Sequence, residues 1–145
     1  KPGKIEIYIT VPEVDGLSVS GSGDIEANEL SSRILDLAVS GSGNIVIDEL
    51  DSKKVKAVIS GSGNINVGDG GVADELRVSI SGSGNFDGTG FEADQISVST
   101  SGSGNCKVNS DGNVKARIAG SGSVFYKGNA SIDASVAGSG KVRKM

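Results

Sequence analysis

A short glycine-rich phrase recurs seven times along this chain and sets its period. The first copy reads Ser20-Gly21-Ser22-Gly23-Asp24-Ile25. Measured between the first glycines of the copies, the steps are 20, 20, 21, 20, 18 and 18 residues; these glycines are Gly21, Gly41, Gly61, Gly82, Gly102, Gly120 and Gly138. A period near 20 residues indicates stacked supersecondary units, each too small to bury an apolar face alone.

Alternating apolar and polar residues precede each phrase. Leu35, Leu37 and Val39 share one face of such a segment, and Asp36 and Ala38 share the other. This period of two predicts a strand. A second, shorter strand follows each phrase, with inward positions at Ile25, Ile45, Ile65, Phe86, Cys106 and Val124. A third apolar point, at Leu30, Leu50, Val72 and Phe91, completes some units.

Two or three short strands per unit, stacked in register, predict an all-β fold. We expect a single-stranded parallel β-helix with a period of 18–21 residues, forming one solenoid domain over residues 1–145. The seven phrases, with one more irregular coil in residues 5–19, predict about seven to eight coils. Neighbouring coils would pair through main-chain hydrogen bonds about 4.8 Å apart.

The repeated phrase is interpreted as a corner that turns each coil, because glycine enters positive-φ conformations without steric cost. The following Asp or Asn would stack into a ladder along the corners. The predicted corner ladder comprises Gly21, Gly23, Asp24, Gly41, Gly43, Asn44, Gly61, Gly63, Asn64, Gly82, Gly84, Asn85, Gly102, Gly104, Asn105, Gly120, Gly122, Gly138 and Gly140.

Two ligand-binding interpretations of the phrase have less support than its interpretation as a structural corner. A phosphate loop needs a lysine or a third glycine that opens a helix, and the phrase has neither context. A calcium site needs several carboxylates or carbonyls around one ion, but only Asp24 among the corner positions is acidic. We therefore expect no metal and no cofactor.

Acidic residues offer one candidate surface site. Stacking could bring Asp48, Asp69 and Asp87 together, and a glycosidase needs two carboxyl groups within about 5–10 Å. The chain has no histidine and no tryptophan, and long loops that could build a cleft are missing from the pattern. We therefore expect no catalytic residues. Cys106 falls on an inward position and is interpreted as a buried apolar residue.

The charge is divided along the chain. Residues 1–100 hold 7 Lys and Arg against 16 Asp and Glu, a balance of −9, whereas residues 101–145 hold 7 against 2, a balance of +5. A formal net charge of −4 argues against nucleic acid as a partner. The split allows a homo-oligomer through head-to-tail contact, and residues 1–12, which show no cap for the first coil, allow contact through that end.

The recurring Gly-Ser-Gly-Asn-Ile, as at Gly41 to Ile45, resembles the bacterial family called putative auto-transporter adhesin, head GIN domain. The lead-in from Ile7 to Pro12 and the segment from Val124 to Gly128 are similar to that family as well. The resemblance implies a right-handed β-helix in the periplasm, at the outer membrane or on the surface of Gram-negative bacteria. It also implies that this chain is the C-terminal part of a longer protein.

Three functions stay open at this point. The first is a non-enzymatic envelope or surface β-helix that serves as a scaffold or adhesive module for a surface glycan or a protein ligand. The second is a carbohydrate-active β-helix that uses the acidic residues between Asp48 and Asp94. The third is a self-assembling structural protein.

Overall fold

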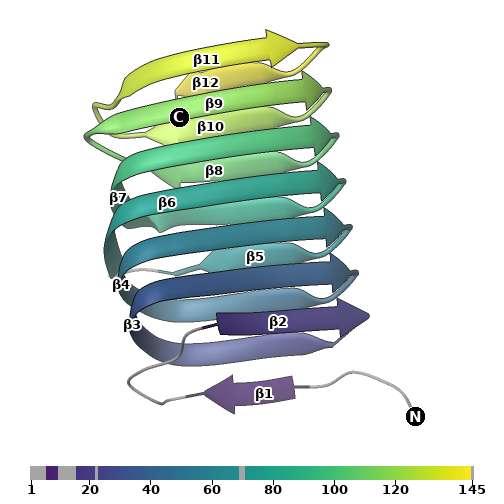
Figure 1. Cartoon of the computed structure of the whole chain (residues 1–145), viewed down its shortest axis with the longest axis vertical. Coiled ribbons are helices and arrows are strands. Elements are labelled where there is room, and N and C mark those ends of the chain that lie inside the picture. Colours follow the sequence, from purple (N-terminus) through teal and green to yellow (C-terminus); the bar gives the residue numbers. More distant parts are fainter. Residues whose placement is uncertain (1–5, 10–15, 22, 69–70, 145) are drawn as a thin grey trace.

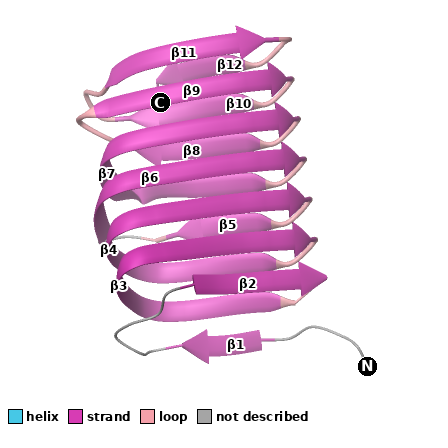
Figure 2. Cartoon of the chain, viewed as in Figure 1, coloured by secondary structure: helices cyan, strands magenta, loops and turns pink. Residues whose placement is uncertain are grey.

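The computed structural model describes residues 6–9, 16–21, 23–68 and 71–144, and every regular element in them is a β-strand. Figure 1 and Figure 2 show these strands wound into one right-handed coil with parallel neighbours. The strands are β1 (Glu6–Ile9), β2 (Gly16–Gly21), β3 (Asp24–Gly41), β4 (Asn44–Gly61), β5 (Asn64–Val67), β6 (Gly71–Gly82), β7 (Asn85–Gly102), β8 (Asn105–Asn109), β9 (Asn113–Gly120), β10 (Ser123–Lys127), β11 (Ser131–Ala137) and β12 (Lys141–Lys144). The predicted all-β, parallel β-helix is confirmed.

The solenoid has two broad faces. The front face, nearest the viewer in Figure 1, is formed by β2, β6, β9, β11 and the second halves of β3, β4 and β7. The back face is formed by β1, β5, β8, β10, β12 and the first halves of the same three long strands. The glycine-rich phrases join the front-face strand of one coil to the back-face strand of the next, at the right in Figure 1.

The number of coils is lower than predicted. The structure has about five turns, and these are the turns that pair with a neighbour along both edges. The prediction of seven to eight coils is based on the number of corner phrases. A phrase at either end of the stack does not belong to a complete coil. Before the first phrase, β1 and β2 both pair with β3, and the rest of the predicted irregular coil lies outside the described residues.

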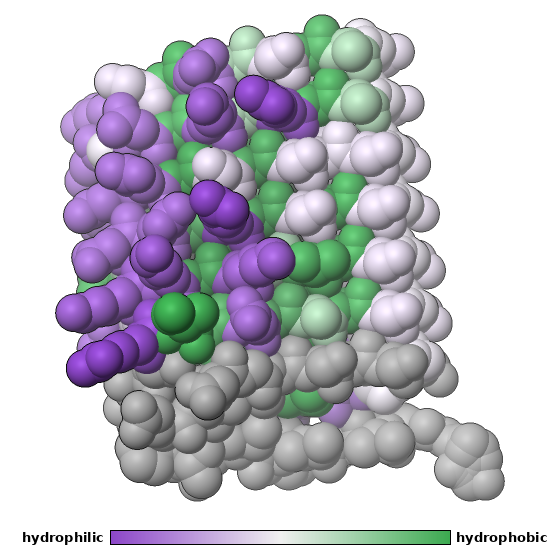
Figure 3. Space-filling model, in the orientation of Figure 1, coloured by the Kyte–Doolittle hydropathy of each residue, from purple (hydrophilic) through white to green (hydrophobic). Residues whose placement is uncertain are grey.

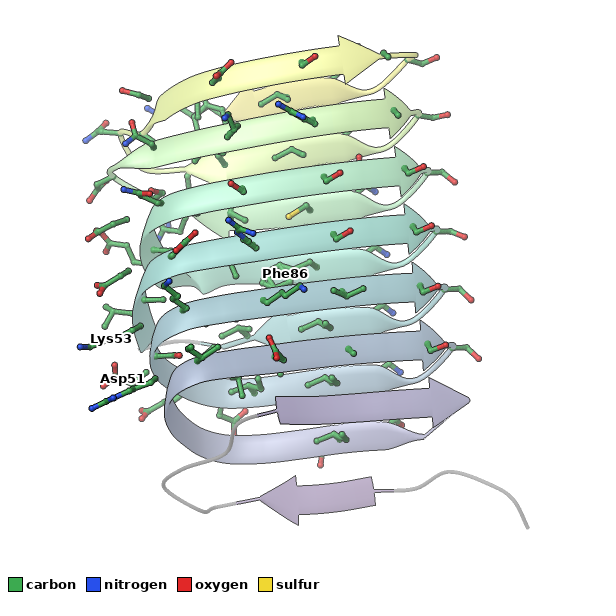
Figure 4. The ribbon with its side chains drawn as sticks, in the orientation of Figure 1. Asp51, Lys53 and Phe86 are labelled. Carbon is green, nitrogen blue, oxygen red and sulfur yellow. The ribbon has the colours of Figure 1, made fainter. Side chains whose placement is uncertain are left out.

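The core lies between the two faces, and the predicted inward positions fill it. Phe86 is its largest fully buried side chain and lies between the faces in Figure 4. One inward column of the front face consists of Leu35, Val55, Leu76, Ile96 and Val114. One inward column of the back face consists of Ile25, Ile45, Ile65, Phe86, Cys106 and Val124. Because each coil covers the one before it, these short strands bury a continuous core that no single unit could form.

Two apolar side chains are exposed, although the apolar pattern of their units continues through them. Val72 is 57% exposed, because the 21-residue step places it opposite Asp51 and leaves Ala73 to point inward. Val136 is 42% exposed although it faces inward, because β11 pairs with β9 on one side only.

Candidate functional site

The first glycine of each phrase makes the corner. All seven have positive φ, between 90° at Gly21 and 122° at Gly138, a region that favours glycine. Each corner also bonds to the corner of the next coil. The carbonyl of Gly61, for example, accepts N–H bonds from Ser83 and Gly84, both at 3.0 Å. The corner is therefore a continuous hydrogen-bonded column with little freedom to move around a ligand.

The second glycine of each phrase has a different role. Gly84 is buried and does not have positive φ, but a Cβ placed there would collide with the carbonyl oxygen of Gly63 and with Ile59 Cγ2. The same close approach recurs at Gly63, Gly104, Gly122 and Gly140. These glycines let neighbouring coils stack with their backbones in contact.

Asparagine amides form a ladder beside the corner, on the back face. Asn64 Nδ2 donates to Asn44 Oδ1 at 3.1 Å, and Asn85 Nδ2 donates to Asn64 Oδ1 at 3.1 Å. Each of these oxygens also accepts the backbone N–H of the next coil, at 3.2 Å in both cases. At the start of the ladder, Asp24 Oδ1 accepts bonds from the backbone N–H and the side-chain amide of Asn44. At its other end, the backbone N–H of Asn105 donates to Asn85 Oδ1, and that of Ser123 donates to Asn105 Oδ1. Such ladders stabilise stacked strands.

The back face has a broad open hollow of about 760 Å³ next to this ladder. Asn66, Asp87, Lys107 and Phe125 border it. They lie in one column on consecutive coils, because their strands pair in register. Along the column, these side chains are an amide, an acid, a base and an aromatic ring. The charges of the acid and the base cancel, so the four residues carry no net charge.

The front face gathers positive charge. Its outward positions form columns, and the column five residues before each corner glycine reads Asp36, Lys56, Arg77, Ser97, Lys115 and Asp133. In the next column Arg117 follows Ser79 and Ser99. We call Lys56, Arg77, Lys115 and Arg117 the cationic patch. It surrounds a shallow depression of about 360 Å³ whose floor includes the three serines.

Hydrophilic side chains stand out on this face amid paler residues in Figure 3. Only Arg77 in the cationic patch has an ion pair with a described residue: its Nε lies 3.5 Å from Glu75 Oε1. Glu75 also lies 3.9 Å from Lys54 Nζ, so its charge is shared. Lys56, Lys115 and Arg117 are exposed and have no ion pair within the described ranges.

The structure does not gather the predicted acidic site among the residues that it describes. Asp48 is level with Gly68 on the next coil, whereas Asp87 is level with Asn66. Asp87 therefore lies in the neighbouring outward column, two coils from Asp48. At about 4.8 Å per coil, their backbones are separated by about 10 Å along the axis alone. Asp69 lies outside the described residues.

Within the described part of the chain, two groups have shifted pKa values. The carboxylate of Asp111 beside Glu92 raises the pKa of the Glu92 carboxyl above its ordinary value, with smaller contributions from burial and Asp94. Burial raises the pKa of the Cys106 thiol, which is completely buried. A thiol held protonated in the core is a poor nucleophile and metal ligand. Across the described ranges, no group of three or more Cys, Asp or Glu residues could hold a metal ion.

Sequence reasoning missed the cationic patch, although its signal was present. The charge balance along the chain places the positive excess after residue 100, and so hides the cations at Lys56 and Arg77. Lys56, Arg77 and Lys115 each stand five residues before a corner glycine. Aligning the units on that glycine would have placed the three cations in one column.

The geometry defines a parallel β-solenoid with two open strand faces and a rigid hydrogen-bonded corner. The chain belongs to the family described as putative auto-transporter adhesin, head GIN domain, whose family model matches residues 1–130. Comparison with curated proteins gave no match. None of the described residues form a helix that could cross a membrane.

Solved structures share the fold over almost the whole chain. A putative adhesin from Parabacteroides distasonis ATCC 8503 is 29% identical with a TM-score of 0.90, covering 98% of this chain and 60% of that one. A putative adhesin from Parabacteroides merdae ATCC 43184 is 27% identical with a TM-score of 0.87, covering 97% and 63%. A protein of Parabacteroides distasonis ATCC 8503 described as a putative lipid binding protein is 27% identical with a TM-score of 0.89, covering 100% and 59%. The chain thus spans about 60% of the length of these proteins.

Proposed function

We propose that this chain is a rigid, non-enzymatic binding module of the bacterial cell envelope or cell surface, with the front face as its binding surface. One observation carries the proposal: the front face holds an open depression bordered by four cations, three of them without an ion pair to a described residue. The description of the family and the putative adhesins among the similar structures support a role in attachment at the envelope.

The architecture suits binding to an extended partner. Neighbouring coils are joined by main-chain bonds along both faces and by the corner column, so the outward side chains project from a frame with fixed spacing. A preformed surface loses little conformational freedom when a ligand binds. A rigid face can therefore hold a polymer by repeated weak contacts.

Cleavage of a polysaccharide is the second candidate, and the structure gives it less support. Asp48 and Asp87 lie in different columns, two coils apart. A glycosidase needs its two carboxyl groups on either side of one glycosidic bond. The hollows on both faces are shallow and open to solvent.

A glycan array combined with an assay for released reducing sugar tests the proposal. We expect the chain to bind immobilised glycans and to release no reducing ends. Release of sugar that is lost in the variant Asp48→Asn or Asp87→Asn would replace the binding module with the enzymatic alternative. Filaments of the isolated chain in electron micrographs, without binding to any glycan, would favour the self-assembling alternative.

A further inference from the structure

We propose that the cationic patch binds a segment of an acidic glycan that carries sulfate or carboxylate groups and runs along the solenoid axis. The inference rests on the proposed binding function and names its ligand class. The register of the front face sets Lys56, Arg77, Ser97 and Lys115 on four consecutive coils.

The spacing of the cations defines an elongated site. Stacked strands lie about 4.8 Å apart, so Lys56 and Lys115 are separated by three coils, or about 14 Å, along the axis. Arg77 lies between them, and Arg117 lies beside Lys115 in the next column. Several anionic groups on one polymer can therefore meet a cation each, whereas a single small anion would use only part of the patch.

The floor of the depression complements a sugar. Ser79, Ser97 and Ser99 are exposed there, and their hydroxyl groups make no side-chain hydrogen bond to another described residue. A hydroxyl both donates and accepts hydrogen bonds, so these serines can pair with sugar hydroxyl groups and with anionic oxygens. Arginine adds paired N–H donors that match sulfate and carboxylate geometry.

The acids around the patch favour a narrow polymer over a membrane surface. Asp36 lies one coil before Lys56, and Asp133 lies one coil after Lys115, in the same column. A flat anionic membrane laid on the front face would cover these two acids as well as the cations, and like charges repel. A glycan segment can lie on the cations between Asp36 and Asp133 without covering either acid.

The test uses a double variant and a control with the same charge change. In Lys115→Ser/Arg117→Ser, the patch receives the residue type that already occupies these columns at Ser97 and Ser99. The control Lys141→Ser/Arg143→Ser removes two exposed cations from β12, on the back face. Binding of a heparin-derived hexasaccharide, a neutral dextran oligosaccharide, and vesicles of phosphatidylcholine with or without phosphatidylserine is measured by titration.

We expect the hexasaccharide to bind the unaltered chain and the dextran oligosaccharide not to bind it. The patch variant should lose about tenfold or more in affinity, and the control less than about twofold, since its cations lie on the opposite face and salt screens distant charges. Equal losses in both variants would overturn the proposal, because they would show an effect of net charge alone. Stronger binding to phosphatidylserine vesicles than to the hexasaccharide would also overturn it. Failure to bind the hexasaccharide, with binding to neutral glycans on the array intact, would remove this inference and leave the binding module standing.

Discussion

The two glycines of the repeated phrase are conserved within this chain for two different physical reasons. Gly61 has a φ of 114° and turns the chain at the corner. Gly63 has no such φ, but its missing Cβ leaves room for the carbonyl oxygen of Gly43 and a methyl group of Val39. The sequence alone indicates conformational freedom as the reason for both glycines. Both approach the preceding coil closely, but only the first glycine has positive φ, and only the second also meets a core side chain.

Thr100 is the polar exception among the inward front-face positions. Its hydroxyl oxygen is buried and has no hydrogen-bond partner. Because an unsatisfied buried hydroxyl is costly, we expect Thr100→Val to raise the free energy of unfolding by about 1–2 kcal/mol in urea denaturation. The control Ser101→Ala, at an exposed neighbour, should change it by less than about 0.5 kcal/mol. A loss of stability in the valine variant would contradict the packing described for this position.

The amide ladder makes a second residue-level prediction. Asn64→Ala removes the oxygen that accepts two bonds from Asn85 and the amide that donates to Asn44. We expect the free energy of unfolding to fall by about 1–2 kcal/mol. Asn66→Ala, two residues along the same strand and outside the ladder, is the matched control and should be nearly neutral. Equal effects of the two variants would show that the ladder does not stabilise the stack.

At the level of the elements, the close stacking of the corners can be tested directly. A Cβ at Gly84 would collide with backbone and with the core side chain of Ile59, neither of which can move aside without disturbing its own coil. We expect Gly84→Ala to lower the free energy of unfolding by about 1–3 kcal/mol. Ser83→Ala, at the exposed neighbouring position, should leave the denaturation midpoint almost unchanged. An alanine at Gly84 that is tolerated as well as one at Ser83 would mean that the coils do not approach this closely.

The strands themselves could be predicted from the sequence because their signal is local. Alternation such as Leu35, Leu37 and Val39 specifies both the strand and its buried face. The exposure of Val72 and Val136 depends on neighbouring coils. Val72 is exposed because the extra residue of its 21-residue step lies before it and shifts its register, and Val136 is exposed because β11 pairs on one side only.

The surface sites were harder to predict, because they form between units rather than within them. Asp48 and Asp87 belong to similar positions in their units, yet an offset of two residues along the strand and two coils along the axis separates them. Lys56 and Lys115 are 59 positions apart in the chain, yet the register sets them in one column. Composition and charge balance do not contain this information, whereas alignment of the repeats does.

At the scale of the whole molecule, local charge matters more than the net charge of −4. Among the described residues, Glu75 is the acid that forms an ion pair with the cationic patch, through Arg77. Both side chains are partly exposed, and such pairs contribute only about 0–1 kcal/mol to stability. The glutamate thus affects the field of the patch more than the stability of the fold.

The variant Glu75→Gln should therefore strengthen binding of the hexasaccharide. We expect an increase of about twofold to fivefold in affinity, greatest at low salt, because the substitution frees Arg77 and Lys54 from their shared partner. Asp74→Asn makes the same change of charge one residue away, at an exposed position that does not border the depression, and should have a smaller effect. Isothermal titration at two salt concentrations measures both. Weaker binding by Glu75→Gln would mean that the glutamate holds Arg77 in its binding position.

The proposed function makes the front face the binding surface of this solenoid. The most direct measurement is an NMR titration of the isotopically labelled chain with the heparin-derived hexasaccharide, following every backbone amide. We predict that the largest shifts fall on β6, the second half of β7 and β9, around Ser79, Ser97 and Lys115. Shifts confined to β5, β8 and β10 on the back face, or spread evenly over the chain, would show that the front face is not the binding surface.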